Sequence, residues 1–289
     1  MKSKSSLELF SSLWAISPSS LYEYKPLFAK ILSGRADSEG RELEANINYL
    51  VDENGDKIEN RSNDIPPGTV GVVNLIGPMI KYGNWYLWGA DELVEMLEAL
   101  DKHPNVVGTI LRIDSGGGAV KAVPVFANFL KRKKKPVVAL CDICASAAIW
   151  VKSYCDYSFA ENNISAMFGS IGVLAHLFSY KKFYEDLGIE EHIIVSDYSE
   201  DKNKAFTLAE KGKYKLIKEE YLNPTAKQFQ ETIKVKHPKL KQDVPGILKG
   251  KMFYAEQALE YGLINEIGTF EKAVQKVHEL ANINSFLNS

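Results

Sequence analysis

The sequence predicts an α/β protein with a mainly parallel sheet and covering helices, preceded by a smaller, irregular N-terminal region. From residue 69 onward, β-branched apolar runs alternate with segments whose apolar residues recur at helical spacing. Two of these runs lead into stretches of small residues, at 113–118 (IDSGGG) and 144–148 (CASAA). A turn-rich run at 62–68 precedes the alternation. We therefore divide the chain into an N-terminal extension, 1–65, and a main domain, 66–289.

The individual elements follow from spacing and composition. In the extension, 7–16 and 21–32 are predicted to be short amphipathic segments. Helical spacing is clear at 91–100, where apolar residues recur and acidic residues occupy the first turn. The predicted strands are 70–76, 106–113, 137–140, 157–160 and 170–174, and the predicted helices are 91–100, 122–131, 145–154, 255–261 and 271–280, with a charged helical stretch over 181–236. This alternation places ligand sites at the carboxyl ends of the strands.

Composition excludes several classes of protein. The formal net charge is −2, whereas a dedicated nucleic-acid binder usually carries a strong basic excess. The basic run 131–135 precedes Pro136 at a predicted helix end, where cations suit the helix dipole. No apolar run approaches the roughly 20 residues needed to span a bilayer. We expect a soluble protein with no nucleic-acid partner and no stable membrane insertion.

The two small-residue stretches suggest acyl-transfer chemistry. The glycines of the first leave backbone N–H groups accessible, and Gly117 and Gly118 are the predicted oxyanion donors. The second offers Ser146 as a nucleophile between small neighbours. The alternatives are structural: Ser146 as a helix cap, and the glycines as a simple strand-to-helix turn.

Four stretches together resemble the signal peptide peptidase A family of serine peptidases, within the Clp/crotonase superfamily. The stretch 111–118 is similar to that family's strand ending in Ser-Pro-Gly-Gly, and 145–148 is similar to its Ala-Ser-Gly-Gly turn. The stretches 168–173 (FGSIGV) and 255–268 (AEQALEYGLINEIG) are similar to its later motifs. The run 13–18 (LWAISP) also resembles the opening of phage capsid-associated members.

The resemblance implies a Ser–Lys dyad, in which a neutral lysine amine takes the proton of the serine hydroxyl. Ser146 is then the nucleophile, and the base falls in 195–206, which lacks the family's proline. Lys202 fits the register best and Lys204 is the second choice. Ser170 resembles the serine that orients the amine, although a turn hydroxyl is its plain alternative. Ala147 and Ala148 replace the family's glycines and would narrow the pocket.

The leading hypothesis is a serine endopeptidase that works through an acyl-enzyme. The resemblance implies a ring-like homo-oligomer in which a neighbouring subunit could supply the lysine, and a substrate that is a signal peptide remnant or a phage capsid or scaffold protein. The alternatives are a crotonase-type acyl-CoA enzyme and a catalytically inactive assembly subunit. The protein is expected to be cytoplasmic, or virion-associated if it is phage-encoded.

No cofactor and no metal are expected. Cys141 and Cys144 have the spacing of a redox or metal half-site. A second cysteine pair for zinc is missing from the sequence, which holds three cysteines in all. We interpret both as small buried residues beside the Ser146 turn.

Overall fold

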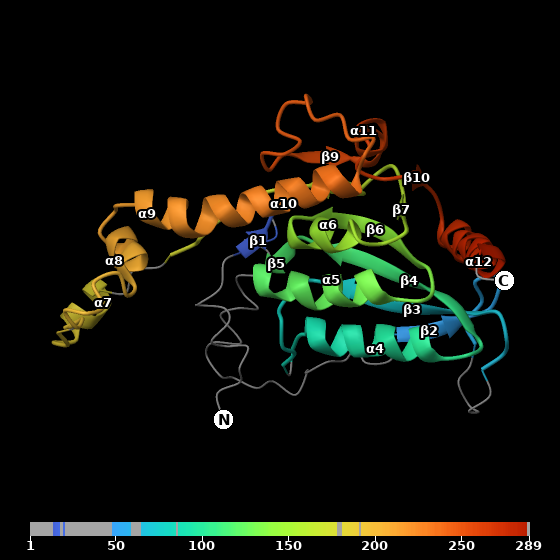
Figure 1. Ribbon diagram of the computed structural model, residues 1–289, viewed down its shortest axis with the longest axis horizontal. Helices are drawn as coiled ribbons and strands as arrows, with labels where there is room; N and C mark the ends of the chain where they lie inside the picture. The colour runs from blue at the N-terminus through green and yellow to red at the C-terminus, as the bar shows by residue number, and fades with distance from the viewer. Residues whose placement is uncertain are drawn as a thin grey trace.

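A computed structural model shows a three-layer α/β body with a long projecting arm (Figure 1). It describes residues 14–17, 20, 48–58, 65–84, 86–177, 181–190 and 192–287.

A mostly parallel sheet forms the centre of the body. Its main path follows the order β10-β7-β6-β4-β3-β2, and β8 and β9 extend it beside β6. The strands are β2 (Asn48–Val51), β3 (Thr69–Ile76), β4 (Val106–Ser115), β6 (Val137–Ala145), β7 (Tyr157–Ala160), β8 (Met167–Gly169), β9 (Met252–Tyr254) and β10 (Glu266–Ile267). β2 pairs antiparallel with β3, and β9 pairs antiparallel with β8; the other pairings are parallel. The central strands are almost continuously apolar because both faces of a parallel sheet are covered.

Alternation along the strands divides the core into two layers. Val72, Ile110 and Val138 pack with α12 (Phe270–Leu287) on one face. Their neighbours Leu111 and Ala139 belong to the larger core on the other face. That face is covered by α4 (Ala90–Lys102), α5 (Val123–Arg132), preceded by the 3₁₀ turn η2 (Val120–Ala122), and α6 (Ala147–Lys152).

The arm leaves the body after residue 177 and returns along one helix (Figure 1). Its parts are α7 (Lys181–Asp186), α8 (Lys204–Glu210), α9 (Lys215–Ile217) and the π-helical turn η3 (Lys218–Leu222). The returning helix α10 (Asn223–Lys236) packs on α6, where the Phe229 and Trp150 rings stack with centroids 4.3 Å apart. α11 (Ala255–Glu260) then leads to β10. Among the described residues, no helix is long and apolar enough to cross a bilayer.

A second, two-stranded sheet joins the beginning of the chain to the body. β1 (Trp14–Ile16) pairs antiparallel with β5 (Gly117–Ala119), the strand that holds the predicted oxyanion glycines. On its other side, Trp14 forms an isolated antiparallel bridge with Leu174.

The α/β class and the mainly parallel sheet with covering helices are confirmed, and three local predictions are wrong. Residues 14–16, expected in an amphipathic segment, form a strand because β5 offers a hydrogen-bonding edge. The strand expected at 170–174 is instead β8, ending at Gly169, because Ser170 has φ +53°. The stretch 181–236 is not continuously helical, since residues 187–190 and 192–203 form no helix.

Two further predictions stay untested. The segments 7–13 and 21–32 lie outside the described residues. The division into 1–65 and 66–289 stays a prediction; the structure shows that β1 and β2, from the first of these parts, pair with strands of the second.

Candidate active site

Ser146 lies at a sharp turn between strand β6 and helix α6. Its backbone has φ +55° and ψ −118°, outside the regions that non-glycine residues ordinarily adopt. The Ser146 N–H donates to the Gly169 carbonyl at 2.9 Å, which fixes the turn against the end of β8. A strained strand-to-helix turn of this kind commonly presents a nucleophile. The residue itself is buried, and its Oγ donates to the Gly172 carbonyl at 3.4 Å.

Ser170 lies beside Ser146. The register of β6 and β8 places Ala145 opposite Gly169, so the two serines follow their strands at the same level. Ser170 has φ +53°, and its N–H donates to the Lys251 carbonyl at 2.9 Å. The structure thus brings together the predicted nucleophile and the predicted orienting serine.

The three glycines after β4 are explained by close backbone approach. A Cβ on Gly118 would lie 2.2 Å from the Met79 carbonyl oxygen, and one on Gly117 would lie 2.2 Å from the Ala15 carbonyl oxygen. Gly117 also has φ +95°, a conformation that favours glycine. At Gly116, a Cβ would lie 1.9 Å from the Ser20 hydroxyl oxygen. Each position therefore excludes a side chain for a different reason.

The glycine segment lies next to the start of helix α6. The point that a Gly117 Cβ would occupy is 2.8 Å from the Ala147 nitrogen, so the two predicted halves of the site meet. The Ala147 N–H is the first amide of α6 and has no acceptor within its own helix. It is therefore a candidate oxyanion donor that the sequence prediction did not name. The signal for it was its position at a helix N-terminus directly after Ser146.

The two predicted glycine donors face different partners. The Gly117 N–H donates to Ser115 Oγ at 3.2 Å, and that hydroxyl donates to the Gly77 carbonyl at 2.6 Å. Gly118 lies opposite Ala15 in the β1–β5 register. Strand alternation directs its N–H toward β1, because Gly117 and Ala119 bond to Met79 on the opposite side.

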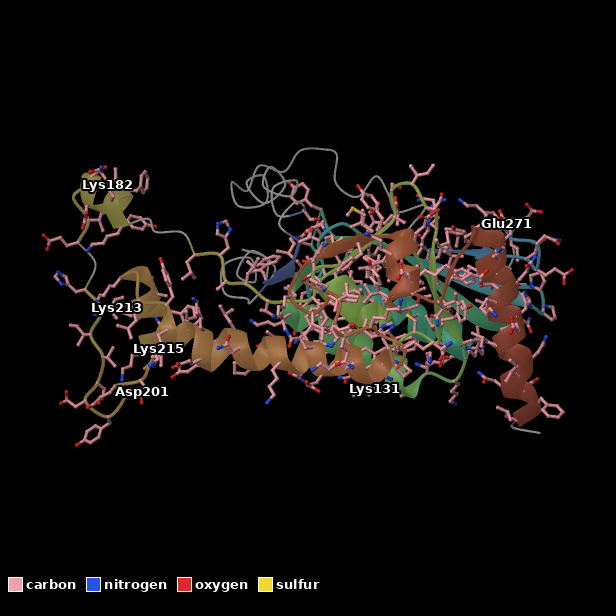
Figure 2. All side chains as sticks on the ribbon, turned by 90° about the horizontal axis from the view of Figure 1, so that it is seen from above. Lys131, Lys182, Asp201, Lys213, Lys215 and Glu271 are labelled. Carbon is pink, nitrogen blue, oxygen red and sulfur yellow. The ribbon has the colours of Figure 1, made fainter. Side chains whose placement is uncertain are left out.

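The two predicted lysines lie far out on the arm. Figure 2 labels Asp201 at its outer end, and Lys204 Nζ is paired with that carboxylate at 2.8 Å. This hydrogen bond raises the pKa of the Lys204 amine. Lys202 is exposed in the turn between Asp201 and α8. Within one copy of the chain, the structure does not bring either amine to Ser146.

A different lysine is buried behind the site. Lys152 ends helix α6, and its Nζ donates to the Leu263 carbonyl and lies 3.3 Å from His237 Nε2. Burial lowers the pKa of Lys152, and burial together with the Lys152 charge lowers the pKa of His237 to about 2. Since Ser146 precedes the opposite end of α6, this pair supports the helix rather than the nucleophile.

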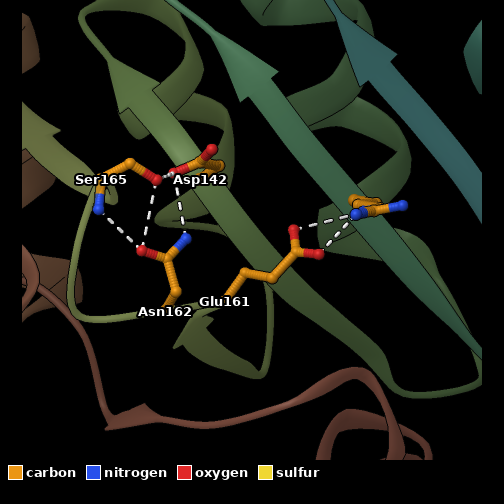
Figure 3. A network of polar contacts seen from close by, with 5 residues as sticks. Asp142, Glu161, Asn162 and Ser165 are labelled. Atoms are coloured by element: carbon orange, nitrogen blue, oxygen red, sulfur yellow. Dashed lines mark hydrogen bonds and ion pairs between the residues drawn. The ribbon is translucent and has the colours of Figure 1, made fainter.

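A polar network borders the same strand ends. Arg112 pairs with Glu161, while Asp142 accepts from Ser165 Oγ at 2.9 Å and from Asn162 at 3.4 Å (Figure 3). This network ties β4, β6 and the loop after β7 together. Cys141 and Cys144 are both buried in β6, and burial raises the pKa of the Cys141 thiol well above its ordinary value.

Much of this sequence is similar to that of known proteins. The profile of peptidase family S49 matches residues 129–284. A putative protease of Methanocaldococcus jannaschii is 31% identical over 66% of this chain and 62% of its own length. Protease 4 of Haemophilus influenzae is 26% identical over 75% of this chain and 35% of its own. The probable protease SohB of Buchnera aphidicola is 27% identical over 65% of this chain and 55% of its own.

The chain therefore spans about a third to three fifths of the length of these relatives. The profile covers more than half of the chain, including β6, the Ser146 turn, the arm and most of α12. By this match, the chain belongs to peptidase family S49.

Proposed function

We propose that the chain is a serine endopeptidase in which Ser146 is the nucleophile. The observation that carries this proposal is the strained Ser146 turn beside a glycine segment into which no side chain fits. In the proposed reaction, Ser146 Oγ attacks the carbonyl carbon of an extended peptide. The N–H groups of Ala147 and Gly118 are proposed to stabilise the oxyanion, because the N–H of Gly117, the other predicted donor, donates to Ser115 Oγ instead.

The proposed base is a lysine from the arm of a neighbouring copy. Lys202 is preferred and Lys204 is the second choice, because both are exposed on a segment that projects from its own body (Figure 2). The neutral amine accepts the Ser146 proton and returns it to the leaving amine, and water then hydrolyses the acyl-enzyme. Ser170, beside Ser146, is proposed to orient the incoming amine.

Exposed apolar side chains on the arm support assembly. Ile194 is 91% exposed and Tyr198 is 99% exposed, and both precede Lys202 by no more than eight residues along the chain. Apolar side chains grouped in this way mark interaction surfaces in soluble proteins. A homo-oligomer would cover them and would carry each arm to the Ser146 turn of the next subunit.

Formation of a fluorophosphonate adduct, detected by intact mass, tests both the Ser146 nucleophile and the lysine base. Wild type is expected to gain one adduct after prolonged incubation, and Ser146→Ala is expected to gain none. Lys202→Ala is expected to lose labelling, with Lys213→Ala on the same arm as the matched control.

Mixing subunits then tests whether the base acts between copies. Unlabelled Ser146→Ala chains, which retain Lys202, are expected to restore labelling of Lys202→Ala chains, which retain Ser146. A folded, assembled wild type that never labels would contradict the peptidase proposal. Restoration that fails in mixed oligomers would contradict only the lysine in trans.

A further inference from the structure

Strand β1 borders the proposed active site along both of its edges. It is inserted between β5, which holds the oxyanion glycines, and the segment around Leu174 that follows Ser170. Trp14 exchanges both backbone hydrogen bonds with Leu174, at 3.2 Å and 2.9 Å. The Ser17 N–H donates to the Gly116 carbonyl at 2.7 Å on the opposite side. The segment is therefore an added strand, bonded along both edges.

The carbonyl of Ala15 faces the catalytic backbone. Because Trp14 directs its N–H and C=O toward Leu174, alternation directs those of Ala15 toward Gly118. The Ala15 carbonyl oxygen and the Ala147 nitrogen also lie against the same face of Gly117, 2.2 Å and 2.8 Å from the position of its absent Cβ. This carbonyl therefore lies among the N–H groups assigned above to the oxyanion site.

The side chains of the segment fit a narrow groove. Ala15 is fully buried in the main core cluster, and Ile16 is 2% exposed. A larger side chain at the position of Ala15 would have to displace residues of this core cluster, in which Ala15 has no exposed surface. Ser17 and Ser20 close the segment through a 2.7 Å hydroxyl contact beside Gly116.

We propose that residues 14–17 are an internal ligand of the peptide-binding groove, bound in the register of a substrate. The groove takes an extended peptide antiparallel to β5, with a small side chain aligned with Ala15. The segment must leave before another peptide can enter, so the chain masks its own active site. This inference rests on the proposed role of Ser146 for its meaning, but the occupancy of the groove can be tested without catalysis.

The test measures peptide binding to full-length chains that cannot react. The probe is a fluorescein-labelled peptide with the sequence of residues 12–19 (SLWAISPS), and all proteins carry Ser146→Ala. Ala15→Pro removes the N–H that faces Gly118 and weakens the internal strand, whereas Ala15→Gly retains it as the matched control. If the segment occupies the groove about nine tenths of the time, releasing it raises the apparent affinity about tenfold.

Fluorescence anisotropy is expected to show that gain for Ala15→Pro and little gain for Ala15→Gly. A probe peptide with Phe in place of the alanine that matches Ala15 is expected to bind more weakly. Equal affinities for the two variants, with both folded by circular dichroism, would overturn the proposal.

A reversible lock keeps the test valid if Ala15→Pro fails to fold. Trp14→Cys with Leu174→Cys joins a directly paired position, where Cα atoms about 5.5 Å apart suit a disulfide. The oxidised form is expected to exclude the probe, and reductant is expected to restore binding to the level of the parent. Equal probe affinity in the oxidised and reduced forms would also overturn the proposal.

Labelling rates separate this inference from the proposed function. With Ser146 restored, Ala15→Pro is expected to react faster with fluorophosphonate than wild type. If no chain labels but the probe still distinguishes Ala15→Pro from Ala15→Gly, the internal ligand stands and the peptidase proposal fails. If all chains label at one rate and the probe does not distinguish them, the internal ligand fails and the peptidase proposal stands.

Discussion

The surroundings of Ser146 and the outer arm are organised in opposite ways. Around Ser146, main-chain atoms approach so closely that Gly117 and Gly118 admit no Cβ, and the neighbouring side chains are buried. On the arm, Gly188 and Gly212 have open space around them, and large apolar side chains such as Tyr198 face outward. The first region is closely packed within one chain. The second holds the two predicted lysines and leaves its large apolar side chains exposed.

The largest effect is expected where the arm joins the body. Phe229→Ala removes a fully buried ring that stacks on Trp150, and such truncations cost about 3–5 kcal/mol of unfolding free energy. Phe206→Ala, at a half-buried ring on the arm, is expected to cost less than half as much. Urea unfolding measures both losses of unfolding free energy. Equal losses would contradict the contrast between the junction with the body and the outer arm.

The two kinds of glycine offer the next comparison. Gly118→Ala places a Cβ against the Met79 carbonyl and is expected to cost about 3 kcal/mol through overpacking. Gly188→Ala, at φ +74° but in open space, is expected to cost about 1 kcal/mol through backbone strain alone. Thermal unfolding with fluorophosphonate labelling checks this pair. Gly118→Ala should lose labelling as well as stability, whereas Gly188→Ala should keep its labelling.

Acid should weaken the body through His237. Its pKa is about 2 in the folded chain and 6.5 as a free side chain, so the unfolded state binds more protons between these values. Stability from this residue is therefore lost as the pH falls below about 6.5, by up to about 1.4 kcal/mol per pH unit. Denaturant titrations of wild type and His237→Gln at pH 7 and pH 5 should show a flatter dependence for the variant.

The matched histidine is His192 on the arm, whose side chain is 76% exposed. His192→Gln is expected to leave the pH dependence of stability unchanged. If the pH dependence of stability flattened equally in His237→Gln and His192→Gln, the effect would come from the loss of a titratable charge and not from the burial of His237.

The smallest change is expected at an arm ion pair. Lys204→Ala removes an exposed contact with Asp201, and solvent-exposed pairs of this kind contribute little to stability. Its unfolding midpoint should therefore match that of wild type. If Lys204 rather than Lys202 is the base, the same variant loses fluorophosphonate labelling, so stability and activity separate at this residue.

The parts of the fold and site that sequence predicted are those governed by neighbouring residues. β3, β4, β6 and β7 follow from apolar periodicity, and the turns at Ser146 and Gly117 follow from short runs of small residues at strand ends. What sequence missed depends on distant pairing. β1 is a strand because β5 lies beside it, more than 100 residues along the chain. Lys152 and His237 are 85 residues apart, so no local pattern signals their contact.

The base itself could not be located from one chain's sequence. Motif register favours Lys202, and the structure places this residue, exposed, on the arm and away from Ser146. Ser170, by contrast, was chosen in the same way and lies beside Ser146 because β6 and β8 pair in parallel. The difference is that a strand register is settled within the chain, whereas the position of an arm relative to a neighbour is not.

The stacked rings of Trp150 and Phe229 give the arm a rigid root. Because α10 rests on α6 and Ser146 directly precedes α6, a tilt of the arm is expected to shift the Ser146 turn of the same chain. In a closed ring, a tilt of one arm would then change two active sites: that of its own subunit and that of the neighbouring subunit to which it supplies the lysine. In such a ring, a conformational change at one active site would favour the same change at its neighbours, so the sites would act cooperatively.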